Sequence, residues 1–296
     1  MVGRAGRWHG GADRANLFGP GEGDGGALTP IFCLPQGAAG CLPGSVPPTS
    51  TTLFHVSDLH FGQEDRAALD WFVREAELER PAAILCTGDL TMRGSEREFA
   101  QAREWLAGLP APIALVPGNH DVPYYHHMAR RLIQPYALFR DLVASLPPPP
   151  DLAHIALIPL KTIARAQWRL NWSKGRVAAR DLDAALQGLA AQSGKPLKLV
   201  LGHHPLIDAG TEGSGSTRGG KHALAALARA GVDAVLSGHV HDAFDLTAEA
   251  DGLPVRLIGA GTLSRRLRAS PAGYNRLEWS EQGGLKVSKC SMGGDA

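Results

Sequence analysis

Acidic residues, an amide and histidines gather in five short segments of this sequence. Carboxylate, amide and imidazole groups are side chains that bind manganese, iron or zinc, and no segment contains a cysteine, which argues against a sulfur site. The sequence therefore predicts a metal centre with oxygen and nitrogen ligands. The segments are Asp58-Leu59-His60, Gly88-Asp89, Gly118-Asn119-His120-Asp121, Gly202-His203-His204 and Gly238-His239-Val240-His241.

The spacing within two segments indicates how the candidate ligands approach a metal. One residue separates Asp58 from His60, and one separates His239 from His241. On an extended chain, residues two apart point the same way, so we expect both members of each pair to reach metal. Glycines suit places where the backbone turns sharply or approaches a ligand closely, and the segments contain Gly88, Gly118, Gly202 and Gly238.

A carboxylate placed between two cations can bridge them, and this predicts a hydrolytic reaction. Two metals roughly 3.5 to 4 Å apart can share one water, lower its pKa and aim it at phosphorus. The expected nucleophile is therefore a hydroxide between the metals. No Ser-His-Asp or Cys-His motif and no glycine-rich phosphate loop competes for this role.

Short apolar segments precede the candidate ligands and alternate with amphipathic segments from Leu53 onward, which is typical of a layered α/β fold. Because the carboxyl ends of strands form the ligand crevice of an open α/β sheet, we expect the polar segments to meet at one rim. The predicted strands cover Leu53 to Ser57, Ala82 to Thr87, Ile113 to Val116, Ile155 to Leu160, Leu197 to Leu201, Val232 to Leu236 and Val255 to Ile258.

Helical periodicity predicts the elements between these strands. Ser95 and Glu98 are spaced as a capping box at the start of one helix, and Pro135 is expected to kink or break another. The predicted helices cover Glu64 to Arg80, Ser95 to Leu109, Tyr124 to Leu146, Ala178 to Ala191 and Lys221 to Ala230.

Size and charge limit the domain organisation and the partners. The chain has 296 residues, of which 44% are hydrophobic, enough for one catalytic domain, which we place at residues 51–296. Lysine and arginine number 30 against 29 acidic residues, so net charge indicates neither nucleic acid nor an anionic membrane as a partner. No apolar run approaches the roughly 18 to 20 residues of a membrane span. We expect a cytoplasmic protein, with residues 1–50, rich in glycine and proline, forming a disordered extension.

The five ordered segments resemble the motifs of the calcineurin-like metallophosphoesterase superfamily, from about Leu53 to about Ser264. The resemblance implies an α/β-β-α fold, a central β-sandwich flanked by helices, that holds two divalent metal ions. It assigns one metal to Asp58, His60 and His241, the other to Asn119, His203 and His239, and a bridging role to Asp89.

The resemblance also implies roles around the substrate. His120 would lie beside the scissile phosphate and protonate the leaving oxygen or stabilise the transition state, with Asp121 behind it. The stretch from Gly88 to Gly94 resembles a phosphoprotein phosphatase motif whose arginine contacts phosphate, which makes Arg93 a candidate substrate-binding residue; a solvated position at the start of a helix explains it equally well. His204 should point away from His203 and is a candidate supporting or substrate-binding residue.

The segment from His55 to Gly62 is similar to bacterial class III cyclic nucleotide phosphodiesterases. The leading hypothesis is therefore hydrolysis of a small phosphodiester, a nucleotide in particular. Hydrolysis of a phosphomonoester or of the pyrophosphate of UDP-diacylglucosamine is an alternative. A scaffold without catalysis is a third hypothesis, which the complete set of ligand types disfavours.

Overall fold

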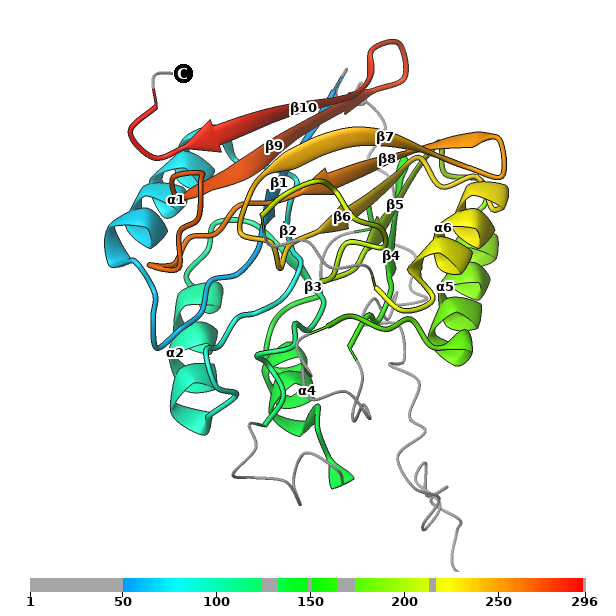
Figure 1. Ribbon diagram of the computed structural model, residues 1–296. Coiled ribbons are helices and arrows are strands. Elements are labelled where there is room, and N and C mark those ends of the chain that lie inside the picture. The colour runs from blue at the N-terminus through cyan, green and yellow to red at the C-terminus, as the bar shows by residue number, and fades with distance from the viewer. Residues whose placement is uncertain (1–49, 124–132, 149–150, 164–173, 213–216, 295–296) are drawn as a thin grey trace, which may run out of the picture.

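The computed structural model describes residues 50–123, 133–148, 151–163, 174–212 and 217–294. Within these ranges the strands form two five-stranded sheets (Figure 1). The first has the order β10-β9-β1-β2-β3 and consists of β1 (Thr51–Val56), β2 (Ala83–Cys86), β3 (Ile113–Leu115), β9 (Gly273–Ser280) and β10 (Gly284–Ser291). The second has the order β4-β5-β6-β8-β7 and consists of β4 (Ile155–Pro159), β5 (Leu197–Leu201), β6 (Ala234–Ser237), β7 (Phe244–Ala250) and β8 (Leu253–Gly259).

Helices cover the outer face of each sheet, which confirms the predicted layered α/β-β-α fold (Figure 1). None of the helices in the described ranges is long and apolar enough to cross a membrane. The first sheet carries α1 (Arg66–Glu79), α2 (Glu96–Ala107) and α4 (Ala137–Ala144), and the second carries α5 (Ala179–Ala191) and α6 (Gly220–Arg229).

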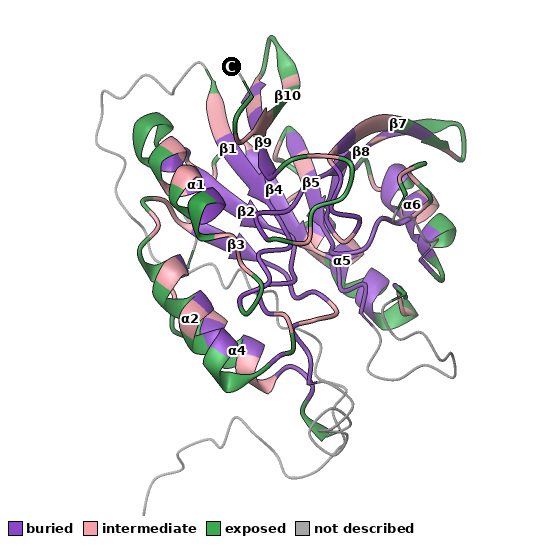
Figure 2. Ribbon diagram, turned by 60° about the vertical axis from the view of Figure 1, so that its left-hand side comes forward, coloured by how far each residue is buried: buried purple, intermediate pink, exposed green. Residues whose placement is uncertain are grey.

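Alternating side chains explain why the central strands are apolar on both faces. In β1, Leu53 packs between the two sheets while Phe54 packs against the helices. In β5, Leu199 faces the other sheet and Val200 faces the helices. Side chains of successive strand residues point to opposite faces, so a strand in the middle of three layers buries every residue. Figure 2 shows this as continuous burial along the central strands and exposed outer faces on α1 and α2.

The start of α2 follows the predicted capping chemistry. The hydroxyl of Ser95 accepts the backbone N–H of Glu98 at 3.3 Å, and the carboxylate of Glu98 accepts the N–H of Ser95 at 3.2 Å, as a capping box requires. The same carboxylate oxygen accepts the N–H of Arg93 at 2.9 Å. The start of α2 is therefore tied to the loop that follows β2.

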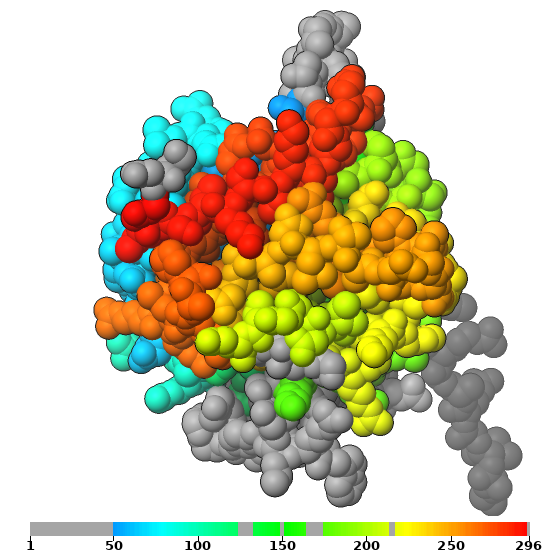
Figure 3. Space-filling view, turned by 45° about the horizontal axis from the view of Figure 1, so that its top comes forward, coloured from blue at the N-terminus to red at the C-terminus, as the bar shows by residue number. Residues whose placement is uncertain are grey.

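Three strands, β7, β9 and β10, were absent from the sequence prediction. Strand β7 pairs antiparallel with β8, β9 with β1, and β10 with β9. Strand β9 alternates between buried and half-buried residues along its second half, β7 has both buried and exposed residues, and β10 has no buried residue, because β7 and the β9–β10 hairpin have one face on the surface (Figure 3). The predicted helix from Tyr124 to Leu146 is described as α4 alone, which begins after Pro135.

Two predicted regions lie outside the described residues. They are residues 1–49 of the predicted extension and residues 124–132 of the predicted helix. The expectation that residues 1–50 form a disordered extension to a single domain stays a prediction.

We predict that burial on α1 decides the effect of a leucine truncation. Leu69 is 1% exposed and packs in the core under the first sheet, whereas Leu78 on the same helix is 79% exposed. Leu69→Ala should lower the free energy of unfolding by about 2 to 5 kcal/mol, and Leu78→Ala should change it by about 0.5 kcal/mol or less. Urea denaturation of both variants measures the difference, and equal losses would contradict this packing.

Candidate metal centre

The predicted ligands converge at the carboxyl ends of the parallel strands. Strands β1, β2 and β3 run parallel in one sheet, and β5 and β6 run parallel in the other, so their following loops meet at a common rim. Among the described residues, four overlapping groups have ligand atoms within 4.8 Å of one another. These groups contain Asp58, His60, Asp89, His120, His203, His204, His239 and His241.

Asp58 faces two histidines. Its Oδ1 atom lies 3.1 Å from Nε2 of His241 and 3.6 Å from Nε2 of His60, and the two Nε2 atoms are 3.2 Å apart. Ligand atoms that share one cation at about 2.1 Å lie roughly 3 Å apart. The separation of these three atoms therefore fits one metal ion.

Asp89 lies between the two halves of the cluster. Its Oδ2 atom is 3.3 Å from Nε2 of His203 and 3.8 Å from Nε2 of His60. Nε2 of His203 is also 3.1 Å from Oδ1 of Asn119. The Asp89 carboxylate is therefore placed to reach cations on both sides.

Backbone amides hold the other oxygen of each carboxylate. The N–H of His239 donates to Oδ2 of Asp58 at 2.8 Å, and the N–H of His120 donates to Oδ1 of Asp89 at 2.8 Å. Each carboxylate thus has one oxygen fixed by the backbone and one facing histidine nitrogens. The second oxygen of Asp58, Oδ1, is buried and takes no regular hydrogen bond among the described residues.

Backbone carbonyls orient three of the histidines. Nδ1 of His60, His203 and His241 lies 3.3, 2.8 and 2.6 Å from the carbonyl oxygens of Thr91, Thr87 and Arg266, respectively. A carbonyl oxygen only accepts hydrogen bonds, so each Nδ1 carries the proton and each Nε2 faces the carboxylates. Once Nε2 is deprotonated, its lone pair and the carboxylate oxygen that it faces fit a divalent cation between them.

Burial and neighbouring charges shift the pKa values in this cluster. Burial raises the pKa of Asp89, but His203, His120 and His60 outweigh it and hold that pKa well below its usual range. Burial lowers the pKa of His203, but Asp89 outweighs it and raises this pKa to about 9. Burial, together with the charge of His203, lowers the pKa of His239 to about 3. The carboxylates therefore stay ionised, ready to bind cations.

The backbone conformation at the candidate ligands differs from the one expected from the sequence. The extended geometry predicted for Asp58-Leu59-His60 and His239-Val240-His241 is wrong, because β1 ends at Val56 and β6 at Ser237. The candidate ligands instead adopt left-handed backbone angles, which are uncommon for residues other than glycine and are found at strained functional sites. Their φ values are 57° at Asp58, 47° at His60, 53° at Asp89, 70° at His239 and 61° at His241.

Two of the predicted glycines are needed for close approach. A Cβ atom on Gly118 would lie 2.1 Å from Oδ1 of Asp89, and one on Gly238 would lie 2.5 Å from Oδ2 of Asp58. The missing side chains let the backbone amides of the next turn reach the carboxylates.

His120 is half-buried beside the cluster. Its Nδ1 donates to the carbonyl of Met92 at 2.6 Å. Its ring packs edge to face against that of His60, with 4.9 Å between the ring centroids. Asp121 is buried and binds the backbone rather than the imidazole: it accepts the N–H of Thr91 at 2.9 Å and of Gly118 at 2.8 Å. Burial, followed by the charge of Asp89, raises the pKa of Asp121 to about 6. Asp121 therefore positions the loop that carries Asn119 and His120.

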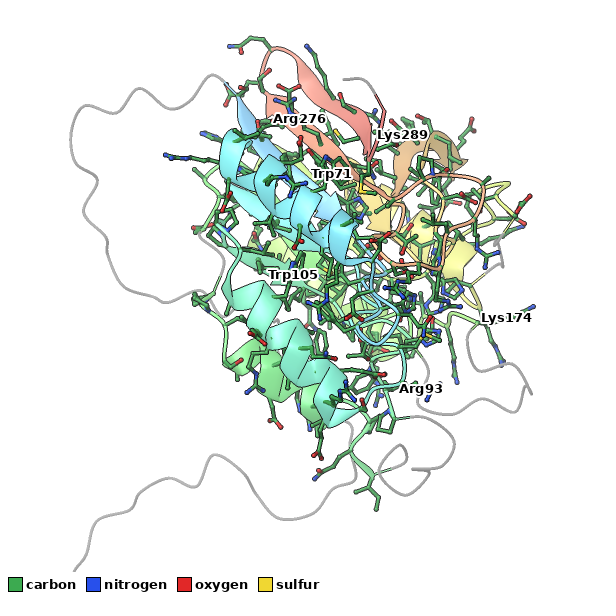
Figure 4. The ribbon with its side chains drawn as sticks, turned by 90° about the vertical axis from the view of Figure 1, so that its left-hand side faces the viewer. Trp71, Arg93, Trp105, Lys174, Arg276 and Lys289 are labelled. Carbon is green, nitrogen blue, oxygen red and sulfur yellow. The ribbon has the colours of Figure 1, made fainter. Side chains whose placement is uncertain are left out.

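The two candidate substrate-binding residues differ in position. His204 is buried, and its Nδ1 forms a hydrogen bond with the hydroxyl of Thr162 at 3.0 Å. Its ring packs against that of His239, with 4.4 Å between the ring centroids. Arg93 is exposed beside the start of α2 (Figure 4), and its guanidinium makes no contact with the cluster among the described residues. The structure thus brings His204 to the cluster and leaves Arg93 outside it.

Arg266 was absent from the sequence prediction but lies at the site. Its Nη1 atom is 3.3 Å from Nε2 of both His60 and His120. It follows β8 and lies beyond the last recognised motif, where no ligand spacing marks it. The only sequence signal is a basic run, Arg265-Arg266-Leu267-Arg268.

Comparisons with known proteins agree with this geometry. The family model described as calcineurin-like phosphoesterase matches residues 51–243. A glycerophosphodiester phosphodiesterase of Enterobacter lignolyticus is 34% identical over 80 residues, which cover 23% of this chain and 29% of that protein. A probable cyclic nucleotide phosphodiesterase of Synechococcus is 27% identical over 204 residues, which cover 65% of this chain and 74% of that protein. The match thus spans less than a third of the first relative.

Solved structures share the fold at low identity. A dimetal phosphatase from Danio rerio superposes with a TM-score of 0.54 and 12% identity, over 81% of this chain and 98% of that one. A purple acid phosphatase from yellow lupin seeds superposes with a TM-score of 0.57 and 12% identity, over 81% of this chain and 51% of that one. These likenesses support the layered fold.

We predict that metal binding displaces protons and strengthens as pH rises. The raised pKa of His203 means that its imidazole carries a proton at neutral pH, and a cation that takes its Nε2 lone pair must displace that proton. The affinity for Mn²⁺ should therefore rise by about tenfold per pH unit for each displaced proton between about pH 6 and pH 8. Calorimetric titration in two buffers of different ionisation enthalpy measures the proton release.

His222→Gln provides the matched control, because His222 is an exposed histidine on α6. Its Mn²⁺ affinity should keep the pH dependence of the unaltered protein, whereas His203→Gln should weaken both affinity and proton release. A Mn²⁺ affinity that does not change with pH would count against this cluster as the metal site.

Proposed function

Because the chain belongs to the calcineurin-like phosphoesterase family, whose model covers residues 51–243, we propose that it is a phosphodiesterase that acts with two divalent metal ions on a small phosphodiester. The observation that carries the proposal is the pair of buried carboxylates, Asp58 and Asp89. Each has one oxygen fixed by a backbone amide and the other turned toward histidine nitrogens. The metal-dependent hydrolase class follows from the family; the two-metal mechanism and the substrate are our proposals.

We divide the candidate ligands between two proposed cations. Asp58, His60 and His241 would hold one, and Asn119, His203 and His239 would hold the other. Asp89 would contact both, since its Oδ2 atom lies between His60 and His203. Oxygen and nitrogen donors of this kind suit manganese, iron or zinc. When bound, such a pair lowers the pKa of a shared water and balances the charge of the phosphoryl group.

His120 is the proposed acid for the leaving oxygen. Its Nδ1–H donates to the carbonyl of Met92, so Nε2 is the nitrogen that faces the cluster. A proton on Nε2 can be donated to the oxygen of the departing alcohol, which is poor at leaving as an anion. Asp121 supports this role by holding the backbone of the loop.

Two relatives support a phosphodiester as the substrate class. One is named as a glycerophosphodiester phosphodiesterase and the other as a probable cyclic nucleotide phosphodiesterase. A small nucleotide diester is therefore the proposed substrate. The expected location of the reaction is the cytoplasm.

Asp89→Asn tests the metal-dependent reaction. Removing the charge that both halves of the cluster share should lower the bound manganese content and reduce hydrolysis of bis(4-nitrophenyl) phosphate by about 1000-fold or more. Metal analysis and initial rates with Mn²⁺ measure both effects. Asp70→Asn is the control, because Asp70 is exposed on α1 and should leave rate and metal content unchanged. A metal-loaded, unaltered protein that hydrolyses no diester, cyclic nucleotide or monoester would refute the proposal.

His120→Gln tests the acid role through the leaving group. If His120 protonates the departing oxygen, its loss should slow the hydrolysis of phenol esters more than that of 4-nitrophenol esters. The rate for the phenol esters should fall by about 100-fold or more. Rates across a series of phenyl phosphodiesters give the dependence on leaving-group pKa. His222→Gln, an exposed change of the same kind, should leave this dependence unaltered. An equal loss for all leaving groups would assign His120 to another role.

A further inference from the structure

Arg266 brings a positive charge to the edge of the metal cluster. The side chain is half-buried, and its Nη1 atom lies 3.3 Å from Nε2 of His60 and 3.3 Å from Nε2 of His120. A third contact is the sulfur of Met92 at 3.9 Å. The guanidinium therefore lies between a candidate metal ligand and the proposed acid.

The turn that carries Arg266 is fixed by its backbone. The N–H of Arg265 donates to the carbonyl of Gln63 at 3.0 Å, and the N–H of Arg266 donates to the hydroxyl of Ser264 at 3.3 Å. The carbonyl of Arg266 in turn accepts Nδ1–H of His241 at 2.6 Å. The backbone thus orients a metal ligand, which leaves the side chain available for a separate task.

The guanidinium lacks an acidic partner in the described part of the chain. Its contacts there are the two imidazole nitrogens and the Met92 sulfur, and no carboxylate lies within ion-pair distance. Arginine keeps its proton under all ordinary conditions and offers a planar fork of N–H donors that matches phosphate oxygens. With cations held by His60 and its neighbours, an anion in front of Arg266 would balance the adjoining positive charges.

We propose that Arg266 is a catalytic residue that binds the non-bridging oxygens of the scissile phosphoryl group. This inference rests on the proposed function and takes over the phosphate contact that the sequence suggested for Arg93, whose side chain is exposed away from the cluster. Arg266 transfers no proton. It donates hydrogen bonds to the phosphoryl oxygens while the oxygen of a hydroxide, formed when a water has released its proton to solvent, bonds to phosphorus. The bond from phosphorus to the leaving oxygen breaks, and His120 protonates the departing oxygen.

The experiment compares Arg266→Ala and Arg266→Lys with Arg265→Ala. Arg265 is an exposed neighbour in the same turn, so its loss removes the same charge from the same loop and controls for long-range electrostatics. The measurements are kcat/KM for bis(4-nitrophenyl) phosphate with Mn²⁺, bound manganese, and calorimetric binding of inorganic phosphate to the manganese-loaded protein.

Arg266→Ala should lower kcat/KM by about 100-fold, as expected for the loss of one donor to the transition state, and should weaken phosphate binding by about tenfold or more. Arg266→Lys keeps the charge but loses the fork, so it should fall between the alanine variant and the unaltered protein. Manganese content should stay constant, because His241 is held by the backbone carbonyl. Unlike in His120→Gln, the loss should be similar for good and poor leaving groups.

Two results would overturn the inference. One is an effect of Arg266→Ala on phosphate binding and kcat/KM no larger than that of Arg265→Ala. The other is a loss of manganese from Arg266→Ala, which would make the side chain structural. Failure of the proposed function looks different: the unaltered protein would then carry manganese and hydrolyse no ester, while phosphate binding would still report on Arg266.

Discussion

The structure depends on the burial of two carboxylates, Asp58 and Asp89, which are 0% and 1% exposed. Moving an ionised carboxylate into the interior costs several kcal/mol, even after the protein relaxes around it. The protein offsets part of this cost. A backbone amide donates to one oxygen, and imidazole nitrogens face the other. A cation between these donors would complete the balance of charge, so the geometry around the two buried carboxylates also suits the site to a metal ion.

The backbone accommodates this arrangement at some cost. Each ligand held at positive φ, such as Asp58 or His239, carries about 1 to 3 kcal/mol of strain, which persists only where the surroundings impose it. Those surroundings are the sheets, which bury nearly every residue of the strands leading into the loops. The left-handed turns place the amide of His239 against Asp58 and, through Gly238, allow the backbone to approach within hydrogen-bonding distance.

Much of the fold could be predicted from the sequence, because the central strands are apolar on both faces and each ends in a polar segment. Strands β7, β9 and β10 escaped prediction because polar residues interrupt their apolar ones, and β9 in particular owes its place to pairing with the distant β1. The candidate ligands were found by residue type and order. Their left-handed backbone was missed, because residue types do not distinguish an extended pair from two consecutive turns.

Arg266 shows the limit of reasoning from motifs. A motif search finds residues that recur at a fixed distance along the chain, whereas Arg266 reaches His60 across 206 positions. Its place follows from the turn after β8, and that turn is set by bonds to Gln63 and Ser264. Arg93, in contrast, was suggested by its spacing from Asp89, but the bond from its backbone to Glu98 ties it to the start of α2.

The packing of the two sheets against each other sets the distances between the candidate carboxylate and histidine ligands. Asp58 and Asp89 follow strands of the first sheet, whereas His203, His239 and His241 follow strands of the second. Apolar side chains such as Leu53 and Leu199 fill the space between the sheets. One polar contact also joins them there, since Asn275 of β9 donates to the carbonyl of Gly259 in β8 at 2.9 Å. A close-packed interior transmits strain. A substitution that leaves a cavity between the sheets would therefore change the distances between carboxylates and histidines as well as the stability of the fold. The candidate metal centre is thus a property of the packing between two sheets, and residues far from the candidate ligands contribute to it through that packing.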